Sequence, residues 1–386
     1  MMIPYGRQHI TDADIEAVVA VLKSDFITQG PVVEQFEKRI SEYCGVPYAV
    51  AVNSATSALH IACMALELGP GDWLWTSPNT FVASANCAIY CGASVDFVDI
   101  DPATNNMSIA CLAAKLETAK VAGRLPKIVV PVHLCGTSCN MAAIQELAQT
   151  YGFRILEDAS HAIGGKYRSE PIGTCRYSDI TVFSFHPVKI ITTAEGGVAV
   201  TKDAELARCM ALHRSHGITR DPAFMTRAPD GPWYYQQVAL GYNYRLTELQ
   251  AALGLSQFDR LDDYVLRRHE IADRYRQLLD GLPVATPVLP RDSYSALHLY
   301  VIRLRLNRIA FSHRQVFEAL RAAGIGVNLH YIPVHTQPFY QDLGHRLGDY
   351  PEAERYYAEA ISLPMFPTMA DADIERVAEA VKRAVG

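Results

Sequence analysis

The chain has 386 residues, of which 49% are hydrophobic and 20% charged, and its net charge is −6. It has no Lys/Arg cluster, which argues against a nucleic-acid partner, and no apolar stretch long enough to cross a bilayer. The N-terminus lacks the apolar region of a signal peptide, and nine cysteines without metal-ligand spacing indicate reduced thiols, so we expect a cytoplasmic protein without a metal site.

Short apolar runs alternate with helical patterns from about residue 45 to 202, which is typical of a largely parallel sheet flanked by helices. Ligands bind such sheets at the carboxyl ends of strands, where Asn53, Asp158 and Phe185 fall. Helices are predicted at 56–66, 80–90 and 141–151. The predicted strands are 49–53, 73–76, 95–100, 127–133, 154–158, 180–185 and 197–201.

The pattern changes after Tyr244 to a mixed α+β character. Because 386 residues exceed what one core usually supports, we predict a large α/β domain over residues 1–250 and a small α+β domain over residues 251–386. The elements predicted here are a helical stretch at 246–282 interrupted near 261–263, strands at 299–304 and 326–332, and helices at 315–323, 352–361 and 371–385.

Lys189 lies just after an apolar run, in a segment where Val188, Ile190 and Ile191 flank it. Partial desolvation disfavours a charged amine and lowers its pKa, so such a lysine can attack an aldehyde and hold a Schiff base. The alternative is an ordinary loop lysine with its amine in solvent. A lysine of this kind near a carboxylate is the protein half of pyridoxal 5′-phosphate (PLP) chemistry.

The carboxylate predicted to face a pyridinium nitrogen is Asp158, at the end of a strand. Glu157 is its rival, and the alternation of side chains along a strand does not by itself choose between them. His161 follows closely and is suited to bond the phenolic oxygen of the ring, although a structural histidine fits the sequence too.

A phosphate site is predicted where the 49–53 strand meets its helix, in Asn53-Ser54-Ala55-Thr56-Ser57. Free N–H groups and the positive end of the helix dipole favour a dianion there. The same residues are also typical of an ordinary helix N-cap without a bound anion. Ser184 offers a further hydroxyl. Phe81 opens the next helix, where it can stack on an aromatic ring or simply belong to the core.

Together these segments resemble the DegT/DnrJ/EryC1/StrS sugar aminotransferase family. The resemblance implies the type-I PLP-dependent transferase fold of aspartate aminotransferase, with a mostly parallel seven-stranded sheet domain, an N-terminal arm and a smaller C-terminal α+β domain. One departure is the Asn53–Ser57 turn, which replaces a Gly-Thr phosphate turn. The matching pieces cover nearly the whole chain, at 27–31, 53–59, 78–83, 157–162, 183–189, 195–197 and 243–246.

Carried over by position, the resemblance makes Lys189 the catalytic Schiff-base lysine. It implies a homodimer with a shared active site, because Asn243 would reach the phosphate in the neighbouring subunit. The implied cofactor contacts are Asp158, His161, Ser184, Thr56, Ser57, Phe81 and Asn243. The implied substrate contacts are Tyr5, Asp25, Phe26, Ile27, Thr28, Ala55, Leu329, His330, Tyr331 and Ile332.

Three stretches are similar to the family members that serve pseudaminic acid biosynthesis: 192–197, 214–222, and 231–235 ahead of 241–245. This resemblance implies L-glutamate as amino donor and a UDP-linked 4-keto-6-deoxy-N-acetylhexosamine as acceptor. Alternative acceptors are UDP-4-keto-arabinose, a dTDP-4-keto-6-deoxyhexose and the GDP-perosamine precursor. A non-catalytic PLP-fold binding protein is a further alternative, but the lysine that it would lack is present, and a sugar 3-dehydratase would have histidine at that position.

Overall fold

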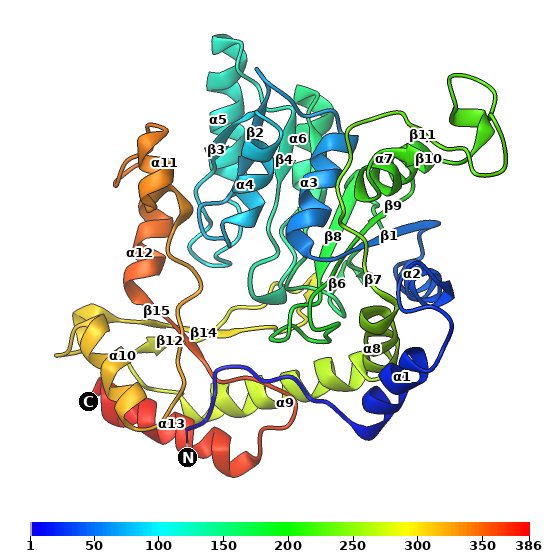
Figure 1. The fold of residues 1–386 in the computed structure, drawn as a ribbon. Helices are drawn as coiled ribbons and strands as arrows, with labels where there is room; N and C mark the ends of the chain where they lie inside the picture. Colours follow the sequence, from blue (N-terminus) through cyan, green and yellow to red (C-terminus); the bar gives the residue numbers. More distant parts are fainter. Residues whose placement is uncertain (1) are drawn as a thin grey trace.

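The computed structural model describes residues 2–386 and is built on a seven-stranded sheet of order β1-β9-β8-β5-β4-β2-β3 (Figure 1). Strand β9 is antiparallel to both neighbours and the other pairs are parallel, which confirms the predicted mostly parallel sheet. The strands are β1 (Tyr48–Val52), β2 (Trp73–Thr76), β3 (Ser94–Phe97), β4 (Ile128–Val130), β5 (Arg154–Asp158), β8 (Ile180–Ser184) and β9 (Gly197–Thr201).

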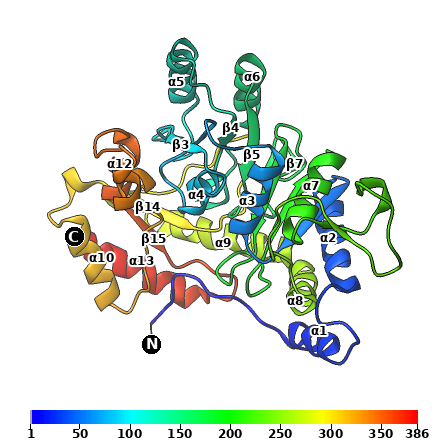
Figure 2. The ribbon, with the colours of Figure 1, turned by 45° about the horizontal axis from the view of Figure 1, so that its top comes forward.

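Helices cover both faces of this sheet because its apolar side chains alternate between the faces (Figures 1 and 2). On one face, Leu74 and Val130 belong to a core shared with α3 (Ala55–Ala65), α4 (Ala83–Tyr90) and α7 (Ala204–Arg214). The opposite face packs on α5 (Ile109–Ala122) and α6 (Met141–Tyr151) at the β2–β4 side, and on α2 (Pro31–Cys44) and α8 (Glu248–Phe258) at the β8–β9 side.

The chain after α8 continues through α9 (Leu261–Leu278) into an antiparallel sheet of order β12-β14-β15. The predicted interruption near residue 261 is confirmed. The division into domains at residue 250 stays a prediction. The sheet consists of β12 (Val284–Ala285), β14 (Tyr300–Leu304) and β15 (Ala360–Leu363), and its helices are α10 (His313–Ala322), α11 (Pro338–Asp342), α12 (Pro351–Glu359) and α13 (Asp371–Val385).

The strand predicted at 326–332 is wrong. This segment forms only an isolated bridge between Asn328 and Ser362. The side chain of Asn328 accepts the Leu329 N–H at 2.8 Å, so that donor does not enter a ladder. The partner of β14 is instead β15, which lies partly within the stretch predicted as a helix at 352–361.

The N-terminal arm crosses to the C-terminal part of the chain. Ile3 exchanges backbone hydrogen bonds with Gly324 and Gly326, at 2.9 and 2.7 Å, before α1 (Asp12–Leu22) packs near α8 (Figure 1). This path brings Tyr5 toward the ends of the large-sheet strands. The remaining short strands are β6 (Lys166–Tyr167), β7 (Glu170–Pro171), β10 (Ile218–Thr219), β11 (Gln236–Gln237) and β13 (Ser293–Tyr294), and short 3-10 helices cover Leu134–Gly136, Pro222–Phe224, Leu306–Arg308 and Val334–Thr336.

Across residues 2–386, no helix is long and apolar enough to cross a bilayer.

Candidate active site

A cavity of about 670 Å³ lies at the carboxyl ends of β1, β5 and β8. Because these three strands run in the same direction, their ends meet at one edge of the sheet. The structure therefore brings together residues far apart in the chain. The predicted residues that line the cavity are Tyr5, Ala55, Thr56, Ser57, Phe81, Asp158, His161, Ser184, Lys189, His330 and Tyr331.

Lys189 lies in the wall of this cavity, in a loop held by a 2.9 Å hydrogen bond from its N–H to the His186 carbonyl. Burial lowers the pKa of the Lys189 amine to about 8, although the nearby Asp158 carboxylate raises it in part. A larger fraction of the amine is therefore neutral near physiological pH than for an exposed lysine, although the protonated form still predominates. The amine can act both as a nucleophile and as an acid or base.

Asp158 is the cavity carboxylate, and Glu157 points to the other side of β5. Asp158 Oδ2 accepts a 2.6 Å hydrogen bond from Ser84 Oγ, and its Oδ1 accepts one of 3.0 Å from the Ser160 N–H. Glu157 Oε2 lies 2.7 Å from Nε2 of the buried His133. The tertiary structure thus decides between the two rivals, since only Asp158 faces Lys189 across the cavity.

The predicted phosphate turn forms the N-terminus of α3. Ser54 caps the helix by accepting the Ser57 N–H at 3.1 Å, and Ser57 Oγ donates to Asn53 Oδ1 at 2.7 Å. The Thr56 hydroxyl and the N–H groups of Ala55 and Thr56 have no hydrogen-bond partner among the described residues. These unpaired donors suit an anion such as a phosphate monoester.

Gly197 lets β9 pass directly against this turn. A Cβ at this position would lie 2.5 Å from Ala55 N and 2.6 Å from the Ser54 carbonyl atoms. The second glycine of the Glu195-Gly196-Gly197 motif is therefore required, because two backbones approach each other closely at this position.

Two buried histidines, His161 and His298, also line the cavity. His161 Nδ1 accepts the Cys135 N–H at 3.3 Å, and its Nε2 lies 3.0 Å from Tyr331 Oη. The His298 ring lies 4.4 Å from the His161 ring. Burial and the charge on Lys189 lower the pKa of His161, so its imidazole is neutral.

Some cavity residues were missed by the sequence interpretation. Ser84 and His298 are the main ones, together with Glu195 and His186, whose side chains are 3.9 Å apart at the mouth. Ser84 lies one helical turn beyond Phe81, a spacing that hints at a shared face. No local signal points to His298, because the segment just before β14 reaches the cavity only through the tertiary structure.

Other predicted residues do not line the cavity of their own chain. The predicted contacts Phe26 and Ile27 are 55% and 53% exposed. Asn243 is also exposed and forms a bridge with Ser215. The roles of these residues stay predictions. The full set outside the cavity is Asp25, Phe26, Ile27, Thr28, Leu329, Ile332 and Asn243.

Arg214 and Arg245 lie next to the bridge between Ser215 and Asn243, and they differ in their partners. Arg214 forms an ion pair with Glu37 and donates to the Ala51 carbonyl at 2.8 Å. Arg245 donates to Ser215 Oγ at 3.2 Å, and no carboxylate of the described residues pairs with it. Arg214 is thus engaged in holding β1, whereas the charge of Arg245 is available to a ligand.

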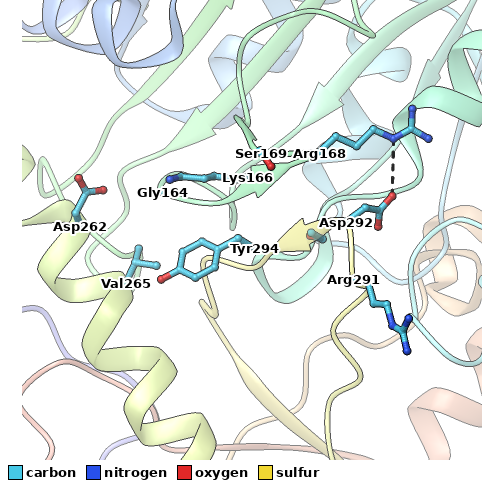
Figure 3. Close-up of a pocket in the computed structure, with 10 residues that line it drawn as sticks. Gly164, Lys166, Arg168, Ser169, Asp262, Val265, Arg291, Asp292 and Tyr294 are labelled. Atoms are coloured by element: carbon cyan, nitrogen blue, oxygen red, sulfur yellow. Dashed lines mark ion pairs between the residues drawn. The ribbon is translucent and has the colours of Figure 1, made fainter.

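A second cavity of about 550 Å³ lies between the β6–β7 turn and α9 (Figure 3). Tyr294 lies at its centre, and Arg168 pairs with Asp292 at 3.9 Å, with both side chains about half exposed. None of its lining residues belongs to the first cavity. Its charges are mixed and partly paired, so we assign it no part in catalysis.

Comparisons with known proteins match the whole chain. The family model of the DegT/DnrJ/EryC1/StrS aminotransferase family matches residues 8–382. The spore coat polysaccharide biosynthesis protein SpsC of Bacillus subtilis is 41% identical over 383 residues, which are 98% of this chain and 96% of that protein.

Solved structures agree with this match. Helicobacter pylori PseC, described as an aminotransferase involved in the biosynthesis of pseudoaminic acid, superposes with a TM-score of 0.91 at 30% identity and covers 100% of this chain and 99% of its own. The putative sugar aminotransferase Spr1654 from Streptococcus pneumoniae, in its PLP form, has a TM-score of 0.88 at 30% identity and covers 100% and 99%.

Proposed function

The chain belongs to the DegT/DnrJ/EryC1/StrS family of PLP-dependent sugar aminotransferases, and we propose that it moves an amino group from L-glutamate to C4 of a UDP-linked 4-keto-6-deoxy-N-acetylhexosamine. This is the reaction of UDP-4-amino-4,6-dideoxy-N-acetyl-β-L-altrosamine transaminase, in the pseudaminic acid pathway. The likeness to PseC supports the choice of sugar. The observation that carries the aminotransferase chemistry is the convergence of Lys189, Asp158 and the α3 turn on one cavity.

The residues of the cavity fit the cofactor. When bound, PLP supplies an electron sink for the carbanion formed at the amino-bearing carbon. Lys189 would hold its aldehyde carbon and Asp158 its ring nitrogen, while Thr56, Ser184 and the first-turn N–H groups of α3 would hold its phosphate. Phe81, 59% exposed at the mouth, would cover the ring.

Each charged residue then has a defined task. Asp158, oriented by Ser84 and Ser160, would accept a hydrogen bond from the protonated ring nitrogen of the cofactor. Lys189, whose pKa is lowered by burial, would take a proton from the substrate carbon and return it.

A homodimer is part of the proposal. The segment between α7 and α8 extends away from the rest of the chain (Figures 1 and 2), and its Trp233 and Leu240 are 72% and 70% exposed. Asn243 is exposed at the end of this segment and does not reach its own cavity. These observations support a second copy that covers the segment and receives Asn243 at its phosphate site. Arg245 is the proposed partner of a glutamate carboxylate, and the cytoplasm is the proposed location.

Another nucleotide-linked ketosugar is the second candidate acceptor. The identity to SpsC, 41%, exceeds the 30% identity to PseC, and SpsC is named for spore coat polysaccharide biosynthesis. The reaction and the residues would be the same, and only the sugar would differ.

Two measurements test the proposal. The purified protein with PLP should absorb visible light and lose this absorbance when L-glutamate is added. After reduction with borohydride, the mass of the wild type and of Lys202→Ala should increase by that of the bound cofactor, whereas the mass of Lys189→Ala should not. Lys202 is an exposed lysine without an ion-pair partner among residues 2–386. The UDP-N-acetyl ketosugar should then convert the amine form of the cofactor back to PLP, with formation of the aminosugar. If that sugar is inert and another ketosugar reacts, the acceptor is wrong; a colourless protein refutes the aminotransferase itself.

A further inference from the structure

We propose that Arg268 is a positioning residue for the acceptor sugar: it fixes the two backbone segments that carry Tyr5 and His298 into the cavity wall. Arg268 lies on α9 and does not itself line the cavity. The inference rests on the proposed function, because it concerns the acceptor that enters the same cavity.

Arg268 is a buried cation without a carboxylate partner. It is 2% exposed, and no Asp or Glu among residues 2–386 forms an ion pair with it. Burial lowers the pKa of the guanidinium to about 10, so the group keeps its charge near neutral pH. A buried charge is costly unless polar groups face it, so its acceptors must stand in fixed positions.

Three backbone carbonyls take the place of a carboxylate. The hydrogens of Arg268 Nη1 are shared between the carbonyls of Leu297, at 3.2 Å, and His298, at 3.1 Å. A third acceptor is the carbonyl of Met365, at 3.2 Å. None of these carbonyls accepts another hydrogen bond among the described residues. The guanidinium is therefore their only donor there, and it joins two segments that are far apart in the chain.

The first segment ends in a cavity residue. His298 lines the cavity, and its N–H donates to the Cys135 carbonyl at 2.9 Å. Its side chain has no hydrogen-bond partner among residues 2–386, and Nδ1 is buried without one. The ring is therefore oriented by packing and by its backbone, whose N–H is bound by Cys135 and whose carbonyl is bound by Arg268.

The second segment reaches the cavity through the N-terminal arm. The Met365 N–H donates to the Tyr5 carbonyl at 3.0 Å, so the two backbone groups of Met365 connect Arg268 with Tyr5. Tyr5 lines the cavity, and its ring lies 5.5 Å from that of His330. The arm is also attached at Ile3. Loss of Arg268 should therefore loosen Tyr5 without releasing the arm.

This wall is separate from the groups that would hold the cofactor. Those groups lie on β5, on the α3 turn and in the loop that contains Lys189, and none of them bonds to Arg268. Tyr5 is a predicted contact of the sugar nucleotide. A displaced wall should therefore weaken the binding of the acceptor and leave the cofactor in place.

Arg267 is the matched control on the same helix. It donates to the carbonyl of Met369 at 2.8 Å, in the segment that follows β15, and its carboxylate partners are Glu270 and Asp371. None of these residues lines the cavity. Arg267→Met should cost stability without a change in acceptor binding.

The test is steady-state kinetics with the UDP-N-acetyl ketosugar, with kcat expressed per site that carries the visible PLP chromophore. Arg268→Lys keeps the charge but shortens the side chain. It should raise the KM for the acceptor about tenfold, the effect of a lost hydrogen bond to a charged group, with nearly unchanged PLP affinity and kcat per site. Arg268→Met should raise this KM further. A purely structural role would instead lower the number of sites with PLP and leave their KM unchanged.

A double-mutant cycle tests the connection to Tyr5. Tyr5→Ala and Arg268→Lys should each raise the KM for the acceptor, and together they should raise it by less than the product of the single effects, because both act on the same contact. The effects of Tyr5→Ala and Arg267→Met should instead multiply. Arg268→Lys and this cycle decide the question where Arg268→Met does not fold, and Arg268→Gln replaces the lysine variant where that one does not.

The outcomes separate the two proposals. A wild-type protein without a chromophore, or one whose amine form no ketosugar converts back, refutes the proposed function. If another ketosugar reacts, the same variants are measured with that sugar. A chromophore together with a wild-type acceptor KM in the Arg268 variants, or an equal rise in Arg267→Met, overturns the role of Arg268 and leaves the aminotransferase intact. Fully multiplicative effects of Tyr5→Ala and Arg268→Lys overturn it too.

Discussion

Ser84 Oγ donates a 2.6 Å hydrogen bond to Asp158 Oδ2 and so connects the start of α4 to the carboxyl end of β5. The Ser84 hydroxyl also lies 2.7 Å from Thr80 Oγ1. Both serine and carboxylate are buried. The carboxylate that would hold the ring nitrogen is therefore oriented by the helix that begins just after Phe81.

Replacing Ser84 by alanine should weaken catalysis without unfolding the chain. Asp158 would keep the Ser160 N–H but lose the Ser84 hydrogen bond that orients its carboxylate toward the cavity. We expect kcat to fall by about tenfold or more, as for one hydrogen bond to a charged group. Steady-state kinetics with L-glutamate checks this, with Ser41→Ala on α2 as control, since that hydroxyl bonds only the Lys38 carbonyl. Equal kcat values in the two variants would contradict the role of Ser84.

Gly197→Ala should loosen the cofactor phosphate site. The added Cβ would lie 2.5 Å from Ala55 N, so the α3 turn or β9 must move, at a cost of about 1–3 kcal/mol. PLP affinity, measured by absorbance titration, should drop together with the thermal stability. Gly69→Ala is the control, because nothing lies within 4 Å of a Cβ there. An unchanged PLP affinity in Gly197→Ala would show that the turn does not hold the phosphate.

The stability of the cofactor-free protein should depend on the pH through Lys189. Its pKa is about 8 in the folded chain and 10.5 as a free lysine, so between these values the unfolded state binds more protons. The free energy of unfolding should therefore rise with pH across this window, by about 3 kcal/mol at most. Relative to the wild type, Lys189→Met should lack this rise, whereas Lys202→Met should keep it. Urea unfolding at several pH values measures the difference, and parallel curves for wild type and Lys189→Met would refute the lowered pKa.

Replacement by glutamine should have different effects at Arg245 and at Arg214. Arg245→Gln should raise the KM for L-glutamate and leave the thermal stability nearly unchanged, because its charge has no carboxylate partner among the described residues. Arg214→Gln should lower the stability, since it breaks the partly buried pair with Glu37. Half-reaction kinetics with glutamate and a melting curve distinguish the two. A normal glutamate KM in Arg245→Gln would move the carboxylate site elsewhere.

Subunit complementation tests the shared active site. Lys189→Ala and Asn243→Ala proteins should each be inactive or weak alone. If Asn243 acts in the neighbouring subunit, mixed dimers contain one intact site, and coexpression should restore about a quarter of the wild-type activity by random pairing. No recovery would place Asn243 and Lys189 in the same subunit's site or outside it.

The chemistry of the site could be predicted from the chain itself because its residues directly follow apolar strands. Lys189, Asp158 and the Asn53–Ser57 turn each follow or end such a run, and parallel strands bring their carboxyl ends together. The elements with strong local patterns, such as β5 and α6, were predicted at their observed bounds. These features depend on residues close in sequence, so local sequence patterns predict them.

Features that depend on distant partners were decided only by the tertiary structure. The choice of Asp158 over Glu157 required the positions of Ser84 and His133 on opposite sides of β5. The backbone at 326–332 is not a strand, because β14 pairs with β15 instead. The tautomer of His161 was decided by the Cys135 N–H, which donates to its Nδ1 from a distant segment. A hydrogen bond between segments far apart in the chain leaves no periodic trace in either one, and it exists only once the two have packed together.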